Sequence, residues 1–239
     1  MAQLAGSAAI LDRGEVEVLG LLPYSSNYTF LARLRAEGSE TLAVYKPNRG
    51  ERPLWDFPTG TLSAREVATF LVSEAAGWHI VPPTVLREEA PLGPGSVQLF
   101  IEHDPELHYL TLMQHRLEDF RVFAALDAVV NNADRKAGHV LQDGDGRVWA
   151  VDHGLTFNVE PKLRTVIWQF AEKPFGDVLR AQLDRLGAEL ARPGGLGDEL
   201  ADLLSPEESA ATLARVETLL VEDCFPSPTS ERPLPWPII

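Results

Sequence analysis

The sequence is poor in cysteine, in basic residues and in long apolar runs, and each shortage excludes a class of protein. Cys224 is the single cysteine among 239 residues, so the chain forms no internal disulfide, which fits a reducing compartment. The 21 Lys and Arg residues stand against 35 Asp and Glu, and the net charge of −14 disfavours non-specific binding to nucleic acid or to an anionic membrane. No apolar run approaches the roughly 18 residues of a membrane-spanning helix. We therefore expect a cytoplasmic protein with no nucleic-acid partner and no stable membrane anchoring.

What the chain does contain is typical of an ordinary globular protein. Its hydrophobic fraction of 45% is sufficient for a packed core, and its length suits one domain of two lobes or two small domains that share an interface. The change in residue pattern near the middle of the chain predicts a first lobe over residues 1–101 and a second over residues 102–239. The predicted fold class is α+β.

The first hundred residues alternate as strands do. Segments 15–22, 28–35 and 41–45 read as an antiparallel meander, and segments 84–87 and 97–101 as two further strands. Between them Ser63 opens a helix that ends near Gly77, with Ser63 as the N-cap and Glu66 completing a capping box. We expect an antiparallel sheet of about five strands with one helix.

The second half is predicted to be mainly helical. Apolar periodicity, interrupted by Asp127, predicts a helix over residues 117–130, and further helices are expected over residues 174–192, 196–204 and 206–222. Ser205 followed by Pro206 is a strong helix start. A proline-rich tail, residues 225–239, follows and is expected to be extended.

Two aspartates on consecutive loops carry the chemistry. Asp134 follows the predicted helix that ends at Asn131, and Asp152 follows a predicted strand over residues 148–151. A turn at residues 143–146 joins the two segments as a hairpin, so both carboxylates can point into one cleft. Phosphoryl transfer needs one Asp to position the attacking group and another to hold Mg²⁺ on the phosphates.

Upstream residues complete this hypothesis. Lys46 leaves a central strand and Glu66 lies in the next helix, which is the pairing that neutralises phosphates in kinase-type folds. The alternative is a solvent-directed lysine and a glutamate that only caps its helix. The loop Ser25-Ser26-Asn27 offers small residues whose backbone N–H groups could cover phosphates, although a plain hairpin loop explains it equally well.

Two further segments complete the candidate sites. The strand that contains Gln98, Phe100 and Ile101 lies where the sheet gives way to helices and offers backbone groups to an adenine, or is simply a buried strand. His103, His108 and His115 have no ordinary zinc spacing and no cysteine partner, so surface histidines are favoured over a metal centre.

Together these segments resemble the phosphatidylinositol 3-/4-kinase-like superfamily, and within it the type II phosphatidylinositol 4-kinases and their actinobacterial relatives. The resemblance covers residues 20 to 170 and rests on five motifs that occur in the family's order. They are Val44-Tyr45-Lys46-Pro47, the Ser63 to Thr84 helical segment, Val97 to Glu102, Asn132-Ala133-Asp134-Arg135 and Val151 to Phe157.

The resemblance implies a bilobal protein-kinase-like fold with ATP between the lobes. Lys46 would contact the α- and β-phosphates with Glu66 as its ion-pair partner, and residues 98–102 would form the hinge beneath adenine. Asp134 would orient the acceptor hydroxyl and Asp152 would bind Mg²⁺. The sequence departs from the family at His139, where an asparagine metal ligand is usual, and imidazole favours softer ions such as Mn²⁺.

Three hypotheses follow from the sequence. The first is an ATP-dependent kinase that uses Mg²⁺ or Mn²⁺ and acts on a soluble protein or small-molecule hydroxyl, because the chain shows no basic cluster or amphipathic basic helix for docking on a bilayer. The second is a nucleotide-binding pseudokinase with a regulatory role, which His139 favours. The third is a metal hydrolase that uses the histidines and aspartates.

Overall fold

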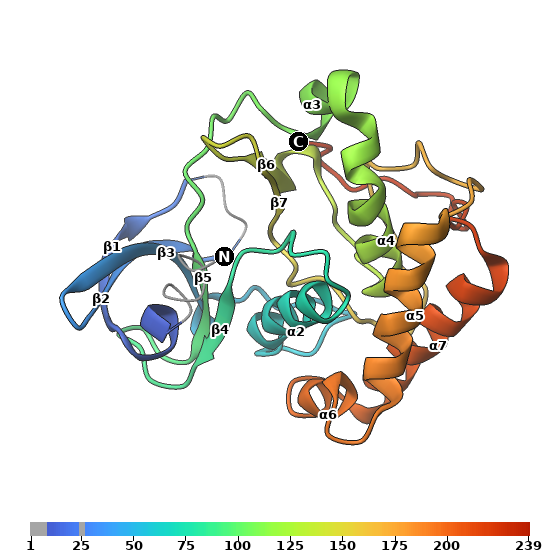
Figure 1. Ribbon diagram of the computed structural model, residues 1–239. Helices are drawn as coiled ribbons and strands as arrows, with labels where there is room; N and C mark the ends of the chain where they lie inside the picture. The colour runs from blue at the N-terminus through green and yellow to red at the C-terminus, as the bar shows by residue number, and fades with distance from the viewer. Residues whose placement is uncertain (1–8, 24–26) are drawn as a thin grey trace.

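A sheet and a group of helices occupy opposite sides of the molecule, with helix α2 between them (Figure 1). The computed structural model describes residues 9–23 and 27–239. Five antiparallel strands form the sheet in the order β1-β2-β3-β5-β4. Their bounds are Glu15–Leu21 for β1, Phe30–Ala36 for β2, Ser39–Pro47 for β3, Thr84–Arg87 for β4 and Gly95–Leu99 for β5. The predicted five-stranded antiparallel sheet is confirmed.

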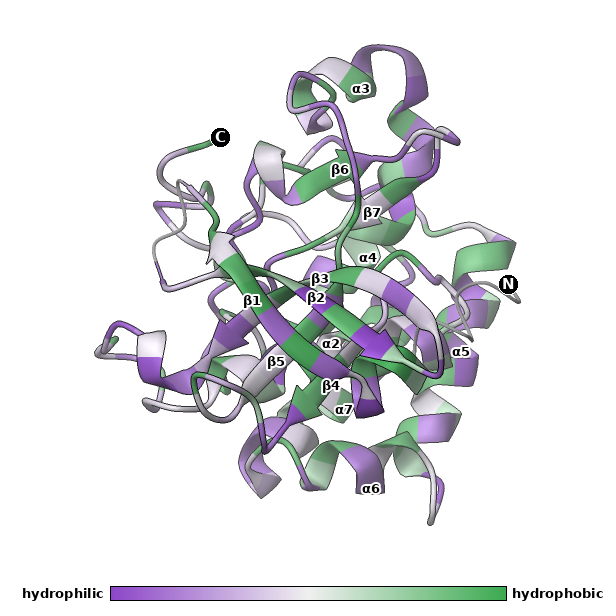
Figure 2. Ribbon diagram, turned by 90° about the vertical axis from the view of Figure 1, so that its left-hand side faces the viewer, coloured by the Kyte–Doolittle hydropathy of each residue, from purple (hydrophilic) through white to green (hydrophobic). Residues whose placement is uncertain are grey.

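Period-two alternation decides which side chains of the sheet are buried. Hydrophobic and hydrophilic residues alternate along β1 and β2 in Figure 2. On β3, Ala43 and Tyr45 are fully buried and pack with Leu34 and Val97 in the core of the sheet. Because successive side chains point to opposite faces of a strand, Lys46 projects away from this core and toward α2.

Helix α2, Leu62–Ala75, belongs to both halves of the molecule. Its residues Ala68 and Val72 are fully buried in the main core, together with Phe123 of the helical half. Burying a Val or Phe side chain stabilises a fold by about 1.5–3 kcal/mol. The helix that carries Glu66 is therefore anchored to the helical half while its other side faces the sheet.

The start of α2 differs from the predicted capping box. The N-cap position is Thr61, without a side-chain cap, and Ser63 lies inside the helix, where its Oγ donates to Asn48 Oδ1 at 2.5 Å. The free N–H groups at this end are instead bound by the carboxylate of Glu51, which accepts from Gly60 N (2.6 Å) and Leu62 N (3.0 Å). A distant carboxylate thus does the capping, so Glu66 is available for another partner.

The helical half surrounds a small hairpin. Its helices are α3 (Tyr109–Arg116), α4 (Arg121–Val129), α5 (Asp177–Ala191), α6 (Leu196–Ala201) and α7 (Pro206–Glu222), and the hairpin consists of β6 (Val140–Gln142) and β7 (Val148–Ala150). A 3₁₀ turn, Leu117–Phe120, joins α3 to α4, so the predicted helix over residues 117–130 is a turn followed by a shorter helix. None of the helices in the described ranges combines the length and apolarity needed to cross a bilayer.

The start of α7 is confirmed as predicted and can be tested directly. Ser205 Oγ accepts from Glu208 N at 3.2 Å, and the Glu208 carboxylate accepts from Ser205 N at 3.0 Å. We expect Ser205→Ala to lower the free energy of unfolding by about 1 kcal/mol, because an amide at the helix start loses its acceptor. Urea denaturation followed by circular dichroism measures the change. Thr218→Ala, on an exposed part of the same helix, should change stability much less, and an equal loss in both variants would contradict the capping role.

Candidate active site

Three segments far apart in the chain meet at the ammonium group of Lys46. Lys46 Nζ lies 2.5 Å from Glu66 Oε1 on α2 and 2.8 Å from Asp152 Oδ1 after β7. The Glu66 side chain is 3% exposed, whereas that of Asp152 is 51% exposed. The structure thus brings together the predicted lysine, its helix carboxylate and one of the two loop aspartates.

The charges of this group control one another's ionisation. Burial alone would lower the pKa of Lys46, but the carboxylates of Asp152 and Glu66 outweigh it and raise that pKa above its ordinary value. The ammonium of Lys46 in turn holds the pKa of Asp152 far below its ordinary value. At neutral pH Lys46 is therefore a cation and Asp152 an anion.

Backbone conformation presents Asp152 to the cleft. β7 ends at Ala150, and Asp152 adopts a left-handed conformation with φ of +62°, which Asp tolerates better than most residues. Gly154 follows, and a Cβ there would lie 3.3 Å from Leu62 Cβ. The small residue allows this loop to lie against the start of α2, which keeps Asp152 within reach of Lys46.

Asp134 lies in the loop after α4. The loop turns at Asn131, which has φ of +52°, and Asp134 N donates to the side chain of Asn132 at 2.9 Å. The Asp134 carboxylate pairs with Lys136 Nζ at 3.0 Å. Burial raises the pKa of Asp134 above its ordinary value, Lys136 opposes the rise, and the charge of Asp152 adds to it. Asp134 is thus within electrostatic range of Asp152, although its own contact is with Lys136.

His139 contacts Asp152 from the other side. Its Nε2 lies 3.2 Å from Asp152 Oδ2, and its Nδ1 lies 3.5 Å from Lys136 N, which donates to it. Burial lowers the pKa of His139 to about 4, with Asp152 opposing the effect, so the ring is neutral at pH 7. A neutral imidazole beside a carboxylate is a ligand pair that suits Mn²⁺ better than Mg²⁺.

A buried network that the sequence argument did not identify supports the catalytic loop. Arg135 and Asp127 are both fully buried, and Arg135 Nε and Nη2 donate to Asp127 Oδ1 at 3.0 and 2.9 Å. Asp127 also accepts from Asn132 Nδ2 (2.9 Å) and Thr165 Oγ1 (3.0 Å), and Arg135 Nη2 contacts His153 Nε2 at 2.7 Å. The signal in the sequence was Asp127 itself, a carboxylate within an apolar helical pattern.

Among the residues predicted to bind the nucleotide, Asn27 and Gln98 have side-chain partners within the protein. Ser25 and Ser26 lie outside the described residues, and Asn27 Oδ1 accepts from Arg52 N at 3.0 Å, which ties two loops together. Gln98 is buried in β5, where its Nε2 donates to Thr84 Oγ1 at 2.8 Å, so its side chain has a structural partner.

The strand end after β5 retains one backbone group for a ligand. Phe100 N donates to Leu42 O at 3.0 Å, and Ile101 O accepts from His103 Nδ1 at 2.8 Å. Ile101 N has no acceptor within the described part of the chain. It is the donor of this segment that an adenine ring could engage.

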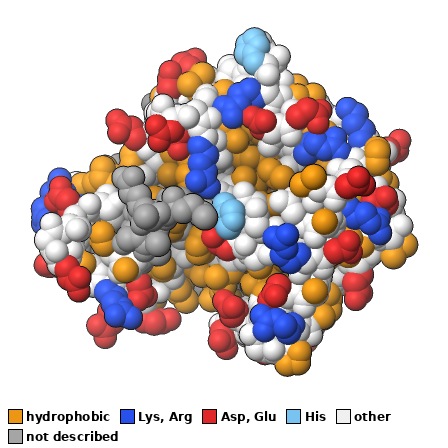
Figure 3. Space-filling view, in the orientation of Figure 1, with side chains coloured by type: hydrophobic (Ala, Val, Ile, Leu, Met, Phe, Trp, Pro, Cys, Tyr) orange, Lys and Arg blue, Asp and Glu red, His pale blue; other side chains and the backbone are white. Residues whose placement is uncertain are grey.

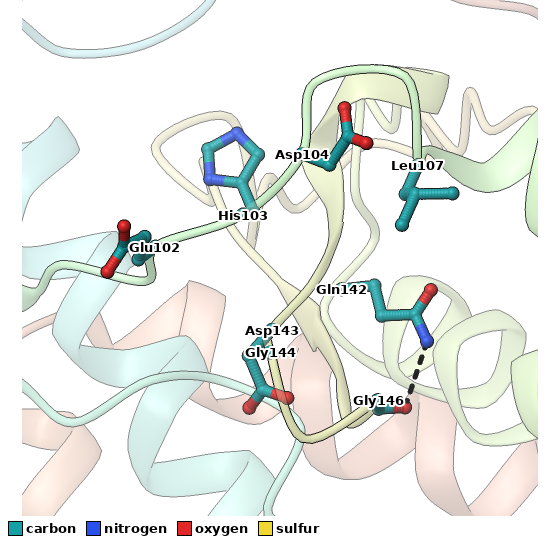
Figure 4. Close-up of a pocket in the computed structure, with 8 residues that line it drawn as sticks. All are labelled: Glu102, His103, Asp104, Leu107, Gln142, Asp143, Gly144 and Gly146. Atoms are coloured by element: carbon teal, nitrogen blue, oxygen red, sulfur yellow. Dashed lines mark hydrogen bonds between the residues drawn. The ribbon is translucent and has the colours of Figure 1, made fainter.

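A pocket of about 550 Å³ adjoins this segment (Figure 4). It lies between the chain that follows Ile101 and the β6–β7 hairpin. Its lining residues are Glu102, His103, Asp104, Leu107, Gln142, Asp143, Gly144 and Gly146. Neither Lys46 nor the two loop aspartates line it, so it lies beside the charged group rather than over it.

Metal ligands supplied by the chain are few. Across residues 9–23 and 27–239, no three side chains of His, Cys, Asp or Glu are placed to hold a metal ion together. Asp152 and His139 are a pair of such ligands. In kinases Mg²⁺ takes one or two ligands from the protein and the rest from substrate phosphates and water. The pair therefore fits a metal that is bound together with a nucleotide.

Comparison with known proteins identifies the family of the chain. No family model matches it. It is 38% identical to protein Rv2133c of Mycobacterium tuberculosis over 96% of this chain and 94% of that protein. The chain belongs to the family of Rv2133c.

The Rv2133c family is distantly related to the phosphatidylinositol 4-kinases. The chain is 28% identical to phosphatidylinositol 4-kinase gamma 4 of Oryza sativa over 54% of its length, and it spans 27% of that larger protein. A similar match to the gamma 4 kinase of Arabidopsis thaliana covers 68% of the chain and 33% of that protein. The predicted membership of the phosphatidylinositol 3-/4-kinase-like superfamily is confirmed.

Solved structures identify the fold of the Rv2133c family. The chain matches hydra Fam20 with a TM-score of 0.61 over 92% of this chain and 88% of that chain, at 13% identity. It also matches the Golgi casein kinase, solved with Mn/ADP bound, with a TM-score of 0.58 at 13% identity, over 92% of this chain and 75% of that chain. It matches the Helicobacter pylori kinase CtkA with a TM-score of 0.54 at 10% identity, over 90% of this chain and 94% of that chain. The chain therefore has a protein-kinase-like fold, as predicted.

The buried network is testable by removing its carboxylate. Asp127→Ala would leave the Arg135 guanidinium buried without an anion, and we expect a loss of about 3–5 kcal/mol in the free energy of unfolding. Asp127→Asn, which keeps one side-chain oxygen acceptor, should lose less. Urea denaturation of both variants measures the difference. The double variant Asp127→Ala/Arg135→Met should recover part of the loss, and strictly additive losses would contradict a direct pair.

Proposed function

We propose that the chain is an ATP-dependent phosphotransferase that acts on a hydroxyl of a protein or small molecule. The observation that carries the proposal is the position of Lys46 Nζ between the carboxylates of Glu66 and Asp152. A buried cation that is fixed by one helix carboxylate and shared with a loop aspartate is what a triphosphate–metal complex requires. The protein-kinase-like fold and the distant relationship to phosphatidylinositol 4-kinases support the same function.

Each residue then has a defined task. Glu66, which is nearly fully buried, holds Lys46, and Lys46 neutralises the α- and β-phosphates. Ile101 N donates to adenine at the boundary between an N-terminal lobe, residues 1–101, and a C-terminal lobe, residues 102–239. Asn27, whose Oδ1 accepts from Arg52 N, would lie near the phosphates, and the predicted phosphate contacts of Ser25 and Ser26 fall outside the described residues.

Asp152 and His139 hold the divalent cation, Mg²⁺ or Mn²⁺, which when bound neutralises charge on the phosphates. With Asp152 turned to the cation, Lys46 would keep its contact with Glu66 Oε1 at 2.5 Å. The Golgi casein kinase, which shares the fold, was solved with Mn/ADP bound.

Asp134 orients the acceptor. Its oxygen accepts the hydroxyl proton of the acceptor while the acceptor oxygen forms a bond to the γ-phosphorus. The bond between the γ-phosphorus and the β,γ-bridging oxygen breaks, and ADP leaves with that oxygen. A raised pKa makes Asp134 a better proton acceptor than an exposed aspartate.

Transfer of the labelled γ-phosphate tests these assignments. We expect Asp134→Ala and Asp152→Ala each to reduce transfer by at least about 10²-fold, because one loses acceptor orientation and the other loses the metal. Asp134→Ala should still bind ATP, as measured by calorimetry, whereas Asp152→Ala should lose the metal dependence of binding. Asp145→Ala, at the exposed turn of the hairpin, is the control. Unchanged transfer in both site variants would overturn the assignments.

The acceptor class can be found with the same label. Cell extract is incubated with the protein and γ-labelled ATP, and the product is fractionated into lipid, protein and small-molecule pools. Extract treated with the Asp134→Ala variant supplies the background.

His139 favours a second candidate function, a nucleotide-binding pseudokinase with a regulatory role. Its Nε2 lies 3.2 Å from Asp152 Oδ2, at the position where the resemblance to the phosphatidylinositol 3-/4-kinase-like superfamily implies an asparagine metal ligand. Stabilisation by ATP with no transfer to any pool of the extract would select this function.

The His139 position also predicts the metal preference. An amide oxygen is a harder ligand than imidazole, so His139→Asn should shift nucleotide-dependent thermal stabilisation from Mn²⁺ toward Mg²⁺. The shift in melting temperature with ATP is compared for the two ions in each variant. His115→Asn, on the exposed side of α3, is the control. An unchanged ratio between the two ions would exclude His139 as a metal ligand.

A further inference from the structure

Arg164 differs from the other arginines of the described ranges. Its side chain is half-buried, yet it has neither a hydrogen-bond acceptor nor a carboxylate partner within those ranges. The other arginines without such a partner lie on the surface. They are Arg49, Arg52, Arg185 and Arg232. The guanidinium nitrogens of Arg164 are not among the buried polar atoms that lack a partner in these ranges, so its five N–H donors are open to an external acceptor.

Backbone hydrogen bonds fix Arg164 beside the catalytic loop. Arg164 N donates to Asn132 O at 2.9 Å, Arg135 N donates to Arg164 O at 3.0 Å, and Val166 N donates to Arg135 O at 3.1 Å. Arg135 and Thr165 form a parallel bridge between the two segments. Residues 163–166 therefore run alongside residues 132–136.

This register decides the direction of the side chains. Arg135 and Thr165, the bridge partners, both point into the protein and both bind the buried carboxylate of Asp127. Since successive side chains of extended segments point to opposite sides, Asp134 and Arg164 share the side opposite to Asp127. In agreement, the charge of Arg164 acts on Asp134, whose side chain is 25% exposed.

The balance of charge at this place leaves Arg164 in excess. Lys136 and Asp134 neutralise each other at 3.0 Å, whereas Arg164 faces the same space with no anion in contact. The chain as a whole carries a net charge of −14, and on the face shown in Figure 3 the Lys and Arg side chains are scattered among Asp and Glu. Arg164 thus differs from the other partnerless arginines in being half-buried and in lying beside the proposed catalytic aspartate.

We propose that Arg164 binds an anionic group of the acceptor, a phosphate or a carboxylate, next to the hydroxyl that Asp134 orients. The planar guanidinium donates two parallel hydrogen bonds to either group. Lys136 supports the site by keeping the charge of Asp134 from repelling the anion. The inference rests on the proposed function and narrows its acceptor to a hydroxyl compound that carries negative charge.

Binding of inorganic phosphate tests the site without knowledge of the acceptor. The full chain is first saturated with Mg²⁺ and a non-hydrolysable ATP analogue, which occupies the phosphate positions around Lys46. Phosphate is then titrated at constant ionic strength and followed by calorimetry, and acetate is titrated in a parallel arm. The arm with the tighter binding identifies the anionic group as phosphate or carboxylate.

We expect saturable binding of one of the two anions to the unmodified chain. Arg164→Gln should weaken it by at least about tenfold, because the charge and both hydrogen bonds are lost. Arg164→Lys, which keeps the charge without the planar fork, should be intermediate. Arg232→Gln, an exposed arginine without a described partner, is the matched control and should bind as the unmodified chain does.

The outcomes separate this inference from the proposed function. If the ATP analogue fails to bind the unmodified chain, the proposed function is wrong. If the analogue binds but neither anion does, or if Arg164→Gln binds the anion as well as the control, the anion site alone is overturned. Because Arg164 has no described partner to lose, the thermal midpoints of its variants should match that of the unmodified chain and confirm their folding.

Discussion

The structure depends on one buried ammonium group that two carboxylates share. Lys46 comes from the sheet, Glu66 from the helix between the two halves and Asp152 from the loop after the small hairpin. None of the three can be buried or half-buried at low cost without the others, because an isolated charge loses its hydration without compensation. The same contact therefore fixes α2 against β3, aims the metal-loop aspartate and leaves a cationic position for phosphates.

A second buried ion pair provides the rigidity that this site needs. Arg135 and Asp127 lie fully inside the helical half and tie α4, the catalytic loop, Thr165 and His153 into one network. The network supplies no group to the cleft. Its consequence is directional: with Arg135 and Thr165 held inward, their neighbours Asp134 and Arg164 face outward. The buried Arg135–Asp127 pair thus sets the direction in which the neighbouring charged side chains point.

Membership of the Rv2133c family and the protein-kinase-like fold together support the proposed phosphotransferase, and the contacts of individual residues carry the details of that proposal. His139, neutral and 3.2 Å from Asp152, lies at the proposed metal position, and Arg164 lies on the proposed acceptor side. His139 ends a short 3₁₀ turn before β6 and Arg164 lies in a loop, whereas Lys46 lies on β3 and Glu66 on α2.

Local sequence by itself determined the strands, most helices and the candidate residues of the site. Alternation marked β1 to β5, Ser205-Pro206 marked the start of α7, and five ordered motifs identified the superfamily. These signals succeed because period-two burial, helix capping and motif order are properties of neighbouring residues.

Tertiary structure decided everything that depended on partners distant in the chain. The carboxylate that caps α2 belongs to Glu51 and not to the predicted capping box at Ser63. Asp127, which stands alone in the sequence pattern, is half of a buried ion pair. Arg164 lies beside Asp134 only because Arg135 forms a bridge with Thr165, 30 residues later in the chain. A sequence lists which groups are charged, but whether a charge is paired or free depends on what lies across the fold from it.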